Sequence, residues 1–323
     1  MRHGFEAWNR PDAGKAEEWA RIRAMRSSVL KLRAYHPTEV VDTALKLNPN
    51  MRFLLRRSHD GTVDPLGQVQ EAQRLINYIQ ARGAWVAYIA DNEPNHPDRS
   101  YADPDAYAKR LARVLAAFRA TYSTLPLVSP PMIVMCETER WLAAIEPVCQ
   151  AYEVEYRGAH AYWQFGNYSE IGWGKSIDAY QTICPGACWI VDEVGDATPM
   201  RSPGDKAVTT LAVLDWLQRR GDVEAATVFI AGGTEDWRAF WLPADECEMI
   251  GNAMAVETAE EGTTMTSGTV MTEQQKILAA LDDMWGRTKD LDAYADEIAL
   301  KTERIRAQII AVKEAVGLNS PKA

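Results

Sequence analysis

The sequence has no long apolar segment and no excess of basic residues. No run of about 18 apolar residues occurs, so we predict no transmembrane helix. The 45 Asp and Glu residues outnumber the 35 Lys and Arg residues, which gives a net charge of -10 at pH 7. A negative surface repels phosphate backbones and anionic lipids. We therefore expect no nucleic-acid partner and no membrane insertion.

The motifs of several enzyme classes are also missing. No G-x-G-x-x-G follows the first predicted strand, which disfavours a dinucleotide-binding fold, and no G-x-S-x-G occurs, which disfavours a serine hydrolase. No group of His, Cys, Asp and Glu residues has metal-ligand spacing, so we predict no catalytic metal and no cofactor. The five cysteines are expected to be buried thiols, with a local disulfide between Cys184 and Cys188 as the alternative.

The N-terminal residues MRHGFEAWNRPD lack the features of a secretory leader. An apolar stretch of about 7–15 residues behind a basic start is absent. The sequence leaves the localisation open between the cytoplasm and a released or virion-associated protein.

The main pattern that is present is a regular alternation of strand-like and helix-like segments. Short segments rich in β-branched and aromatic residues alternate with longer segments of helical period, which is typical of parallel strands joined by helices. The predicted strands are His3–Trp8, Ser28–Ala34, Met51–Arg57, Trp85–Asp91, Leu125–Ser129, Tyr156–Tyr162, Trp189–Glu193 and Ala226–Ala231. Open doubly wound sheets usually stop at about five or six strands, whereas eight such units within about 250 residues suit a closed barrel. Residues 1–256 are therefore predicted to form an α/β domain, a (β/α)8 TIM barrel.

Clear helical periodicity marks two of the connecting segments. Apolar residues recur at helical spacing over Pro65–Arg82 and over Ala106–Tyr122. For the second helix, Asp105 is the predicted N-cap, because Pro104 is expected to prevent an earlier start.

The C-terminal part of the chain has a different pattern. Residues 257–272 are polar and contain EEGTTMTSGT, which predicts a linker. Within residues 273–318, apolar or small residues recur at alternating steps of four and three from Ile277 to Val316, which indicates a coiled coil. Isoleucine at the d positions, as at Ile298 and Ile305, favours three or more helices over a dimer. We expect a homo-oligomer, a trimer or higher; a single amphipathic helix folded onto the barrel is the alternative.

Two glutamates close predicted strands, where a barrel of this type has its active site. Glu93 follows the fourth strand and Glu193 ends the seventh. Apolar strand ends desolvate a carboxyl group and are expected to raise its pKa toward the range useful for proton transfer. A pair of carboxyl groups about 5–5.5 Å apart is what glycosidic cleavage with retention requires. The alternatives are a helix-capping role for Glu93 and a structural ion pair for Glu193.

These strand ends resemble those of clan A of the glycoside hydrolases, of the cellulase-like and mannanase-like type. The resemblance covers about residues 3–255 and rests first on Asn92-Glu93 after the fourth strand and Glu193 at the end of the seventh. It implies a retaining enzyme that cleaves a β-linked poly- or oligosaccharide, with Glu93 as general acid/base and Glu193 as nucleophile. It also implies that Asn92 binds the 2-hydroxyl of the sugar.

Other strand ends extend this resemblance. Arg33 ends the second strand, His160 and Tyr162 form a His-x-Tyr on the sixth, and Trp237 follows the eighth. The resemblance implies that Arg33 and Tyr162 hold the nucleophile ionised and oriented, that His160 lines the subsite, and that Trp237 forms a floor for the sugar.

The loops suggest further sugar contacts, and one strand end departs from the family pattern. Trp8 and Trp163 follow the first and sixth strands, where indole faces stack on sugar rings. Where the family has a histidine after the third strand, this chain has Ser58-His59. The alternative function is a non-catalytic, trimeric carbohydrate-binding or structural protein, such as a phage or envelope adhesin on the same barrel.

Overall fold

The computed structural model describes residues 1–7, 15–57, 64–96, 101, 103–132, 137–163, 177, 180–196, 202–232 and 240–260. The chain divides into two compact units, Met1–Thr263 and Thr264–Ala323. The predicted coiled coil at residues 273–318 lies outside the described residues, and so does most of the predicted linker.

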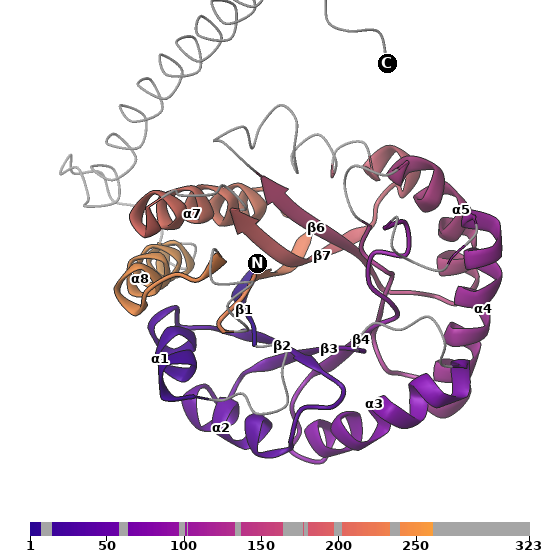
Figure 1. Ribbon diagram of the computed structural model, residues 1–323, viewed down its shortest axis with the longest axis horizontal. Helices are drawn as coiled ribbons and strands as arrows, with labels where there is room; N and C mark the ends of the chain where they lie inside the picture. The colour runs from indigo at the N-terminus through magenta and orange to yellow at the C-terminus, as the bar shows by residue number, and fades with distance from the viewer. Residues whose placement is uncertain are drawn as a thin grey trace, which may run out of the picture. The chain divides into compact units, whose positions relative to one another are not determined.

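The first unit is a closed barrel of eight parallel strands (Figure 1). The strands are β1 (Arg2–Glu6), β2 (Val29–Arg33), β3 (Arg52–Arg56), β4 (Val86–Ile89), β5 (Leu127–Val128), β6 (Tyr156–Trp163), β7 (Cys188–Asp196) and β8 (Val223–Val228). Each strand pairs in parallel with the next along the chain, and β8 pairs with β1 to close the barrel. The predicted fold class is thus confirmed for the barrel.

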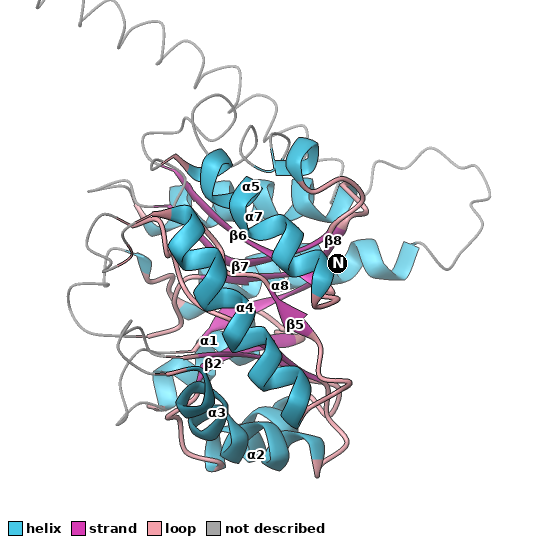
Figure 2. Cartoon of the chain, turned by 90° about the vertical axis from the view of Figure 1, so that its right-hand side faces the viewer, coloured by secondary structure: helices cyan, strands magenta, loops and turns pink. Residues whose placement is uncertain are grey.

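Helices surround the strands on the outside, as Figures 1 and 2 show. They are α1 (Ala16–Ala24), α2 (Glu39–Leu47), α3 (Pro65–Gln80), α4 (Pro104–Thr121), α5 (Thr138–Ala151), α7 (Pro203–Arg219) and α8 (Ala244–Glu260). The main apolar core lies between this ring and the barrel wall. In the described ranges, no helix is both long and apolar enough to cross a membrane.

The barrel interior has an apolar layer followed by a charged layer. Side chains alternate between the two faces of a strand, so residues two apart share the interior. Val29 and Leu54 belong to a small buried apolar cluster that also includes Ile190 on β7. Two residues further along β2 and β3 stand Lys31 and Arg56, which are fully or almost fully buried. The polar end of the interior is therefore the end toward which the strands run.

The eighth strand lies earlier than predicted. It spans Val223–Val228 instead of Ala226–Ala231, because Glu224 does not mark a loop. Glu224 accepts hydrogen bonds at 2.5 Å from Arg2 and at 2.6 Å from Arg52. An ion pair at the rim of the barrel thus lets a charged residue stand inside the strand.

The start of α4 also differs from its prediction. The helix begins at Pro104, and the N-cap is Asp103, whose side chain accepts a hydrogen bond from the Ala106 amide at 2.7 Å. Proline lacks only an amide hydrogen that has no partner in the first turn, so Pro104 favours the start of a helix. The prediction of Asp105 as N-cap was wrong for this reason.

The described cysteines are thiols. Cys184 and Cys188 are both free, so the disulfide considered for them is not formed. Burial raises the pKa of the Cys184 thiol to about 12, which keeps it protonated and unreactive.

Candidate active site

Glu193 lies at the centre of the charged layer, on β7, and both its oxygens are held. Oε1 accepts hydrogen bonds from Lys31 Nζ at 2.8 Å and from an Arg56 guanidinium nitrogen at 2.7 Å. Oε2 accepts a hydrogen bond from the Tyr162 hydroxyl at 2.5 Å. The carboxylate is thus fixed in orientation by groups from three other strands, β2, β3 and β6.

A bulge in β7 shapes this arrangement. Val191 is in register with Ala159 on β6, but the next pair is Glu193 with His160, so Asp192 has no register partner. A bulge of this kind interrupts the strict alternation of side chains. Asp192 Oδ2 and Glu193 Oε1 consequently converge on the same lysine, at 2.7 Å and 2.8 Å from its Nζ.

Tyr162 is positioned by aromatic packing and by a glycine. Its ring lies edge-on to Phe229 and Phe240, with centroid separations of 5.9 Å and 5.8 Å. Gly195 is the register partner of Tyr162 on β7, and a Cβ there would lie 2.9 Å from a Tyr162 ring carbon. Glycine at this position therefore makes room for the ring that orients Glu193.

Glu93 stands in the loop after β4 with a left-handed backbone, φ 45°. For a residue with a side chain this conformation costs roughly 1–3 kcal/mol and persists only where neighbours enforce it. The Glu93 amide donates to the Pro131 carbonyl at 2.9 Å, and the preceding Asn92 amide donates to the Asp91 carboxylate at 2.8 Å. Asp91 in turn accepts a hydrogen bond from the Tyr101 hydroxyl at 2.8 Å.

His160 joins the two glutamates. Its Nδ1 lies 2.8 Å from Glu93 Oε1, and its Nε2 lies 3.6 Å from Glu193 Oε2 and 3.5 Å from Asp192 Oδ1. One carboxylate oxygen of Glu93 and one of Glu193 lie within 4.8 Å of each other. The Glu93 side chain is 15% exposed and that of Glu193 is 6% exposed, so Glu93 is the more accessible of the two.

The charges around the glutamates reverse the pKa shifts expected from the sequence. Burial raises the pKa of Glu193, but the nearby charges of His160, Lys31 and Arg56 outweigh burial and lower it well below its usual range. Burial likewise raises the pKa of Glu93, while the hydrogen bond and charge of His160 lower it. The prediction of raised values was wrong because strand-end burial was considered without these cations.

The pKa of the His160 imidazole is shifted in the opposite direction, upward. Burial lowers the pKa of His160, but the anionic Glu193 and Asp192 raise it to about 10. At neutral pH the pair of His160 and Glu93 therefore shares one proton, bound mainly on the imidazole.

Lys31 and Arg56 hold Glu193 in place of Arg33. The Arg33 guanidinium donates to Glu6 Oε1 at 2.6 Å, and Glu6 also pairs with Arg56 at 3.3 Å. Arg56 Nη1 additionally donates to the Asn92 side-chain oxygen. Arg33 thus belongs to the same network, one ion pair further from the nucleophile candidate.

Several residues that were predicted to contact sugar are not among those that the structure describes. Trp8 and Trp237 are outside the described residues, as are Ser58 and His59, and the side chain of Trp163 is not described.

The site also contains three charged residues that no sequence motif identifies, Glu6, Lys31 and Arg56, and with them Asp192, which was expected to face the barrel wall or a neighbour of the catalytic groups. Lys31 and Arg56 are charged residues in the largely apolar strands VLKLR and RFLLR, and Glu6 and Asp192 stand on β1 and β7 in stretches that are otherwise buried. Charged side chains are almost never fully buried unless paired. A charged residue in a strand that is otherwise predicted to be buried was therefore the sequence signal that could have identified them.

Glu93, His160 and Glu193 are also a candidate metal-ligand group, because one atom of each lies within 4.8 Å of the others. However, Lys31 and Arg56 already neutralise Glu193 Oε1. A cation would have to compete with both, so we assign no metal to this cluster.

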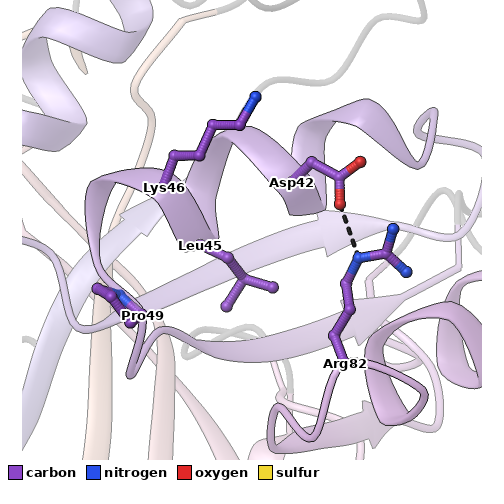
Figure 3. Close-up of a pocket in the computed structure, with 5 residues that line it drawn as sticks. All are labelled: Asp42, Leu45, Lys46, Pro49 and Arg82. Carbon is purple, nitrogen blue, oxygen red and sulfur yellow. Dashed lines mark hydrogen bonds and ion pairs between the residues drawn. The ribbon is translucent and has the colours of Figure 1, made fainter.

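A separate pocket lies on the outer surface, near the C-terminal ends of α2 and α3 (Figure 3). Its volume is about 430 Å³, and it is lined by Asp42, Leu45, Lys46, Pro49 and Arg82. Asp42 is paired with Arg82 at 2.7 Å. This pocket holds no pair of acidic groups comparable to that of Glu93 and Glu193.

Comparison with known proteins adds to this geometry. No family model and no curated protein sequence matches the chain. Solved structures do match. The barrel is similar to those of glycoside hydrolases. One is a curdlan-specific GH128 exo-β-1,3-glucanase from Blastomyces gilchristii in complex with glucose, at 16% identity and a TM-score of 0.51, which covers 76% of this chain and 95% of its own.

Two further structures have the same barrel. A GH128 endo-β-1,3-glucanase from Amycolatopsis mediterranei in complex with laminaritriose has 12% identity and a TM-score of 0.50, covering 78% of this chain and 98% of its own. A family 51 α-L-arabinofuranosidase from Bifidobacterium longum has 12% identity and a TM-score of 0.54, covering 77% and 72%. At these identities the likeness establishes the fold, and the resemblance indicated by the sequence is confirmed at that level.

Proposed function

We propose that the chain is a retaining glycoside hydrolase that cleaves a β-linked poly- or oligosaccharide. The observation that carries the proposal is the approach of Glu93 and Glu193 to within 4.8 Å, oxygen to oxygen, at the charged end of the barrel. Retaining enzymes have carboxyl groups about 5–5.5 Å apart, whereas inverting enzymes leave about 6.5–9.5 Å for a water molecule. The short separation favours a direct attack by one carboxylate.

In the proposed first step, Glu193 attacks the anomeric carbon as the glycosidic C–O bond breaks. The proton shared by Glu93 and His160 passes through Glu93 to the departing oxygen, which leaves as an alcohol. In the second step Glu93 takes a proton from water, whose oxygen displaces Glu193 from the anomeric carbon. The low pKa of Glu193 suits this role, because the nucleophile must be ionised when substrate binds.

The surrounding residues receive supporting roles. Tyr162 orients Glu193, and Asn92, held through its oxygen by Arg56, presents its amide to the sugar 2-hydroxyl. His160, whose side chain is fully buried, holds Glu93 from behind instead of lining the subsite, and Arg33 acts on the site through its ion pair with Glu6. Trp237, Trp163 and Trp8 are proposed as stacking surfaces for sugar rings.

A β-1,3-glucan is the first substrate to test. Two of the similar structures are named as β-1,3-glucanases, and one of them holds laminaritriose. The alternative, a carbohydrate-binding protein without catalysis, gives no reason for the buried Glu193 to stand next to the partly exposed Glu93 with a shared proton beside them.

A substrate panel with stereochemical analysis tests the proposal. Aryl β-glycosides, an aryl arabinofuranoside, curdlan and laminari-oligosaccharides are incubated with the protein, and the first product is observed by proton NMR. We expect the anomeric configuration of the substrate to be retained, because two displacements at one carbon restore it. An inverted first product would exclude the two-step mechanism, and binding without turnover would favour the alternative.

We also propose that residues 273–318 form a coiled coil of three or more chains behind the linker at 257–272. The support is the heptad pattern from Ile277 to Val316. Light scattering at micromolar concentration should give a mass of at least three 36.1 kDa chains. A chain ended at Thr264 should be monomeric and should keep its rate on aryl glycosides while losing avidity for a polymer. A full-length particle with the mass of one chain would refute the oligomer.

A further inference from the structure

Lys31 is a charged residue in the middle of β2 whose side chain is fully buried. An ammonium group has three hydrogens to donate. Its Nζ donates to three acceptors on β7: the Asp192 carbonyl at 2.9 Å, Asp192 Oδ2 at 2.7 Å and Glu193 Oε1 at 2.8 Å. These three acceptors belong to two consecutive residues of one strand across the barrel.

These two residues form the bulge in β7. Opposite them on β8 stands one residue, Thr227, because Val191 is in register with Ala226 and Val194 with Val228. The bulge frees the Asp192 carbonyl from a regular ladder position, and Lys31 and Thr227 both donate to it, at 2.9 Å and 2.5 Å. A buried carbonyl without a partner would cost about 1–3 kcal/mol. The two donors consequently stabilise the irregular backbone that directs Glu193 inward.

The charge of Lys31 has a second effect. Glu6 on β1 lies 2.8 Å from the ammonium as an ion pair, so three carboxylates surround one cation. Two other cationic groups lie near Glu193, Arg56 on β3 and His160 on β6, and the remaining anion is Glu93 after β4. Arg33 on β2 pairs with Glu6. The Tyr162 hydroxyl, which donates to Glu193, is neutral. Without Lys31, Glu6 and Asp192 would face Glu193 with one cation fewer.

We propose that Lys31 is a positioning residue that fastens the β7 bulge and keeps Glu193 ionised and pointed at the substrate. The catalytic role of Lys31 rests on the proposed function, but its effect on the position and ionisation of Glu193 can be measured without any substrate. Thr227 supports the same carbonyl without a charge, and it therefore provides a matched control.

The experiment compares the full-length wild type with Lys31→Met and Thr227→Val. Methionine preserves the length and apolar stem of lysine and removes the charge. Carbon-13 NMR titration of labelled glutamate carboxyls, assigned with Glu193→Gln, reports the protonation of Glu193 without any substrate. We expect the pKa of Glu193 to be about 1 unit or more higher in Lys31→Met, because a contact with an opposite charge is worth roughly 1–3 units. It should stay at the wild-type value in Thr227→Val.

Kinetics on an aryl glycoside provide the second readout. Lys31→Met should lower kcat while leaving KM within about threefold, and it should lose activity at a higher pH than wild type as acid is added. A Glu193 that titrates in Lys31→Met as it does in wild type would overturn the proposal, as would an equal shift in Thr227→Val.

If Lys31→Met does not fold, Glu6→Gln keeps the inference testable. This variant retains Lys31 and removes a competing anion, so Glu193 should titrate no higher than in wild type; a higher value would overturn the proposal. A wild type that hydrolyses no glycoside would count against the proposed function alone.

Discussion

Replacing Glu193 with glutamine is expected to lower kcat on an activated aryl β-glycoside by at least about 10⁴-fold. That loss corresponds to roughly 5.5 kcal/mol of transition-state stabilisation. The amide has nearly the shape of the carboxylate but cannot form the glycosyl-enzyme ester, so no other step compensates. Steady-state kinetics with a good leaving group measure the effect directly, because such a substrate needs little help from a general acid.

A control must separate chemistry from the loss of a buried anion. Glutamine at 193 removes a charge partner from Lys31 and Arg56, so some thermal destabilisation is expected. Asp196→Asn is the matched variant, because Asp196 is also a buried carboxylate on β7 and accepts a hydrogen bond from Thr209 at 3.2 Å. It should keep activity within tenfold of wild type. Glu193→Gln with activity within tenfold would remove Glu193 from the role of nucleophile.

The barrel was predictable because its signal is repeated. The sequence contains eight strand-like segments, and their number predicted that the sheet closes into a barrel, as it does in the structure. Glu93 and Glu193 were identified because the C-terminal ends of all parallel strands lie at one end of a barrel. Two residues that each follow or end a strand are therefore expected to lie near each other. The local pattern was less informative at β8, where the Glu224 ion pair with Arg2 and Arg52 keeps a charged residue inside the strand.

The electrostatics of the site were not predictable in the same way. The cation that contacts Glu193 is determined by the direction of the Lys31 side chain and by the bulge at Asp192. Neither feature has a recognisable sequence motif. A family pattern pointed to Arg33, but Lys31 two residues earlier lies closer to the carboxylate. The pKa directions followed from these contacts, so an argument from burial alone gave the wrong sign for Glu193.

Replacing Glu93 with alanine is expected to slow hydrolysis in a manner that depends on the leaving group. The loss of a general acid typically costs about 10²–10⁴-fold for a poor leaving group, whereas an activated phenol departs with little protonation. With the activated substrate, breakdown of the glycosyl-enzyme becomes limiting because the base is missing. Azide should then accelerate turnover and give a glycosyl azide, since a small anion attacks without a base.

The pH dependence of the same variant tests the shared proton. The pKa of His160, raised to about 10 by Glu193 and Asp192 against the effect of burial, places the loss of the Glu93–His160 proton on the alkaline side. In wild type, kcat/KM for a poor leaving group should therefore be maintained through neutral pH and fall as pH rises toward 10. In Glu93→Ala with an activated leaving group this alkaline limb should disappear, because no proton is delivered. Equal losses for all leaving groups, without azide rescue and with the limb intact, would show that Glu93 has another role.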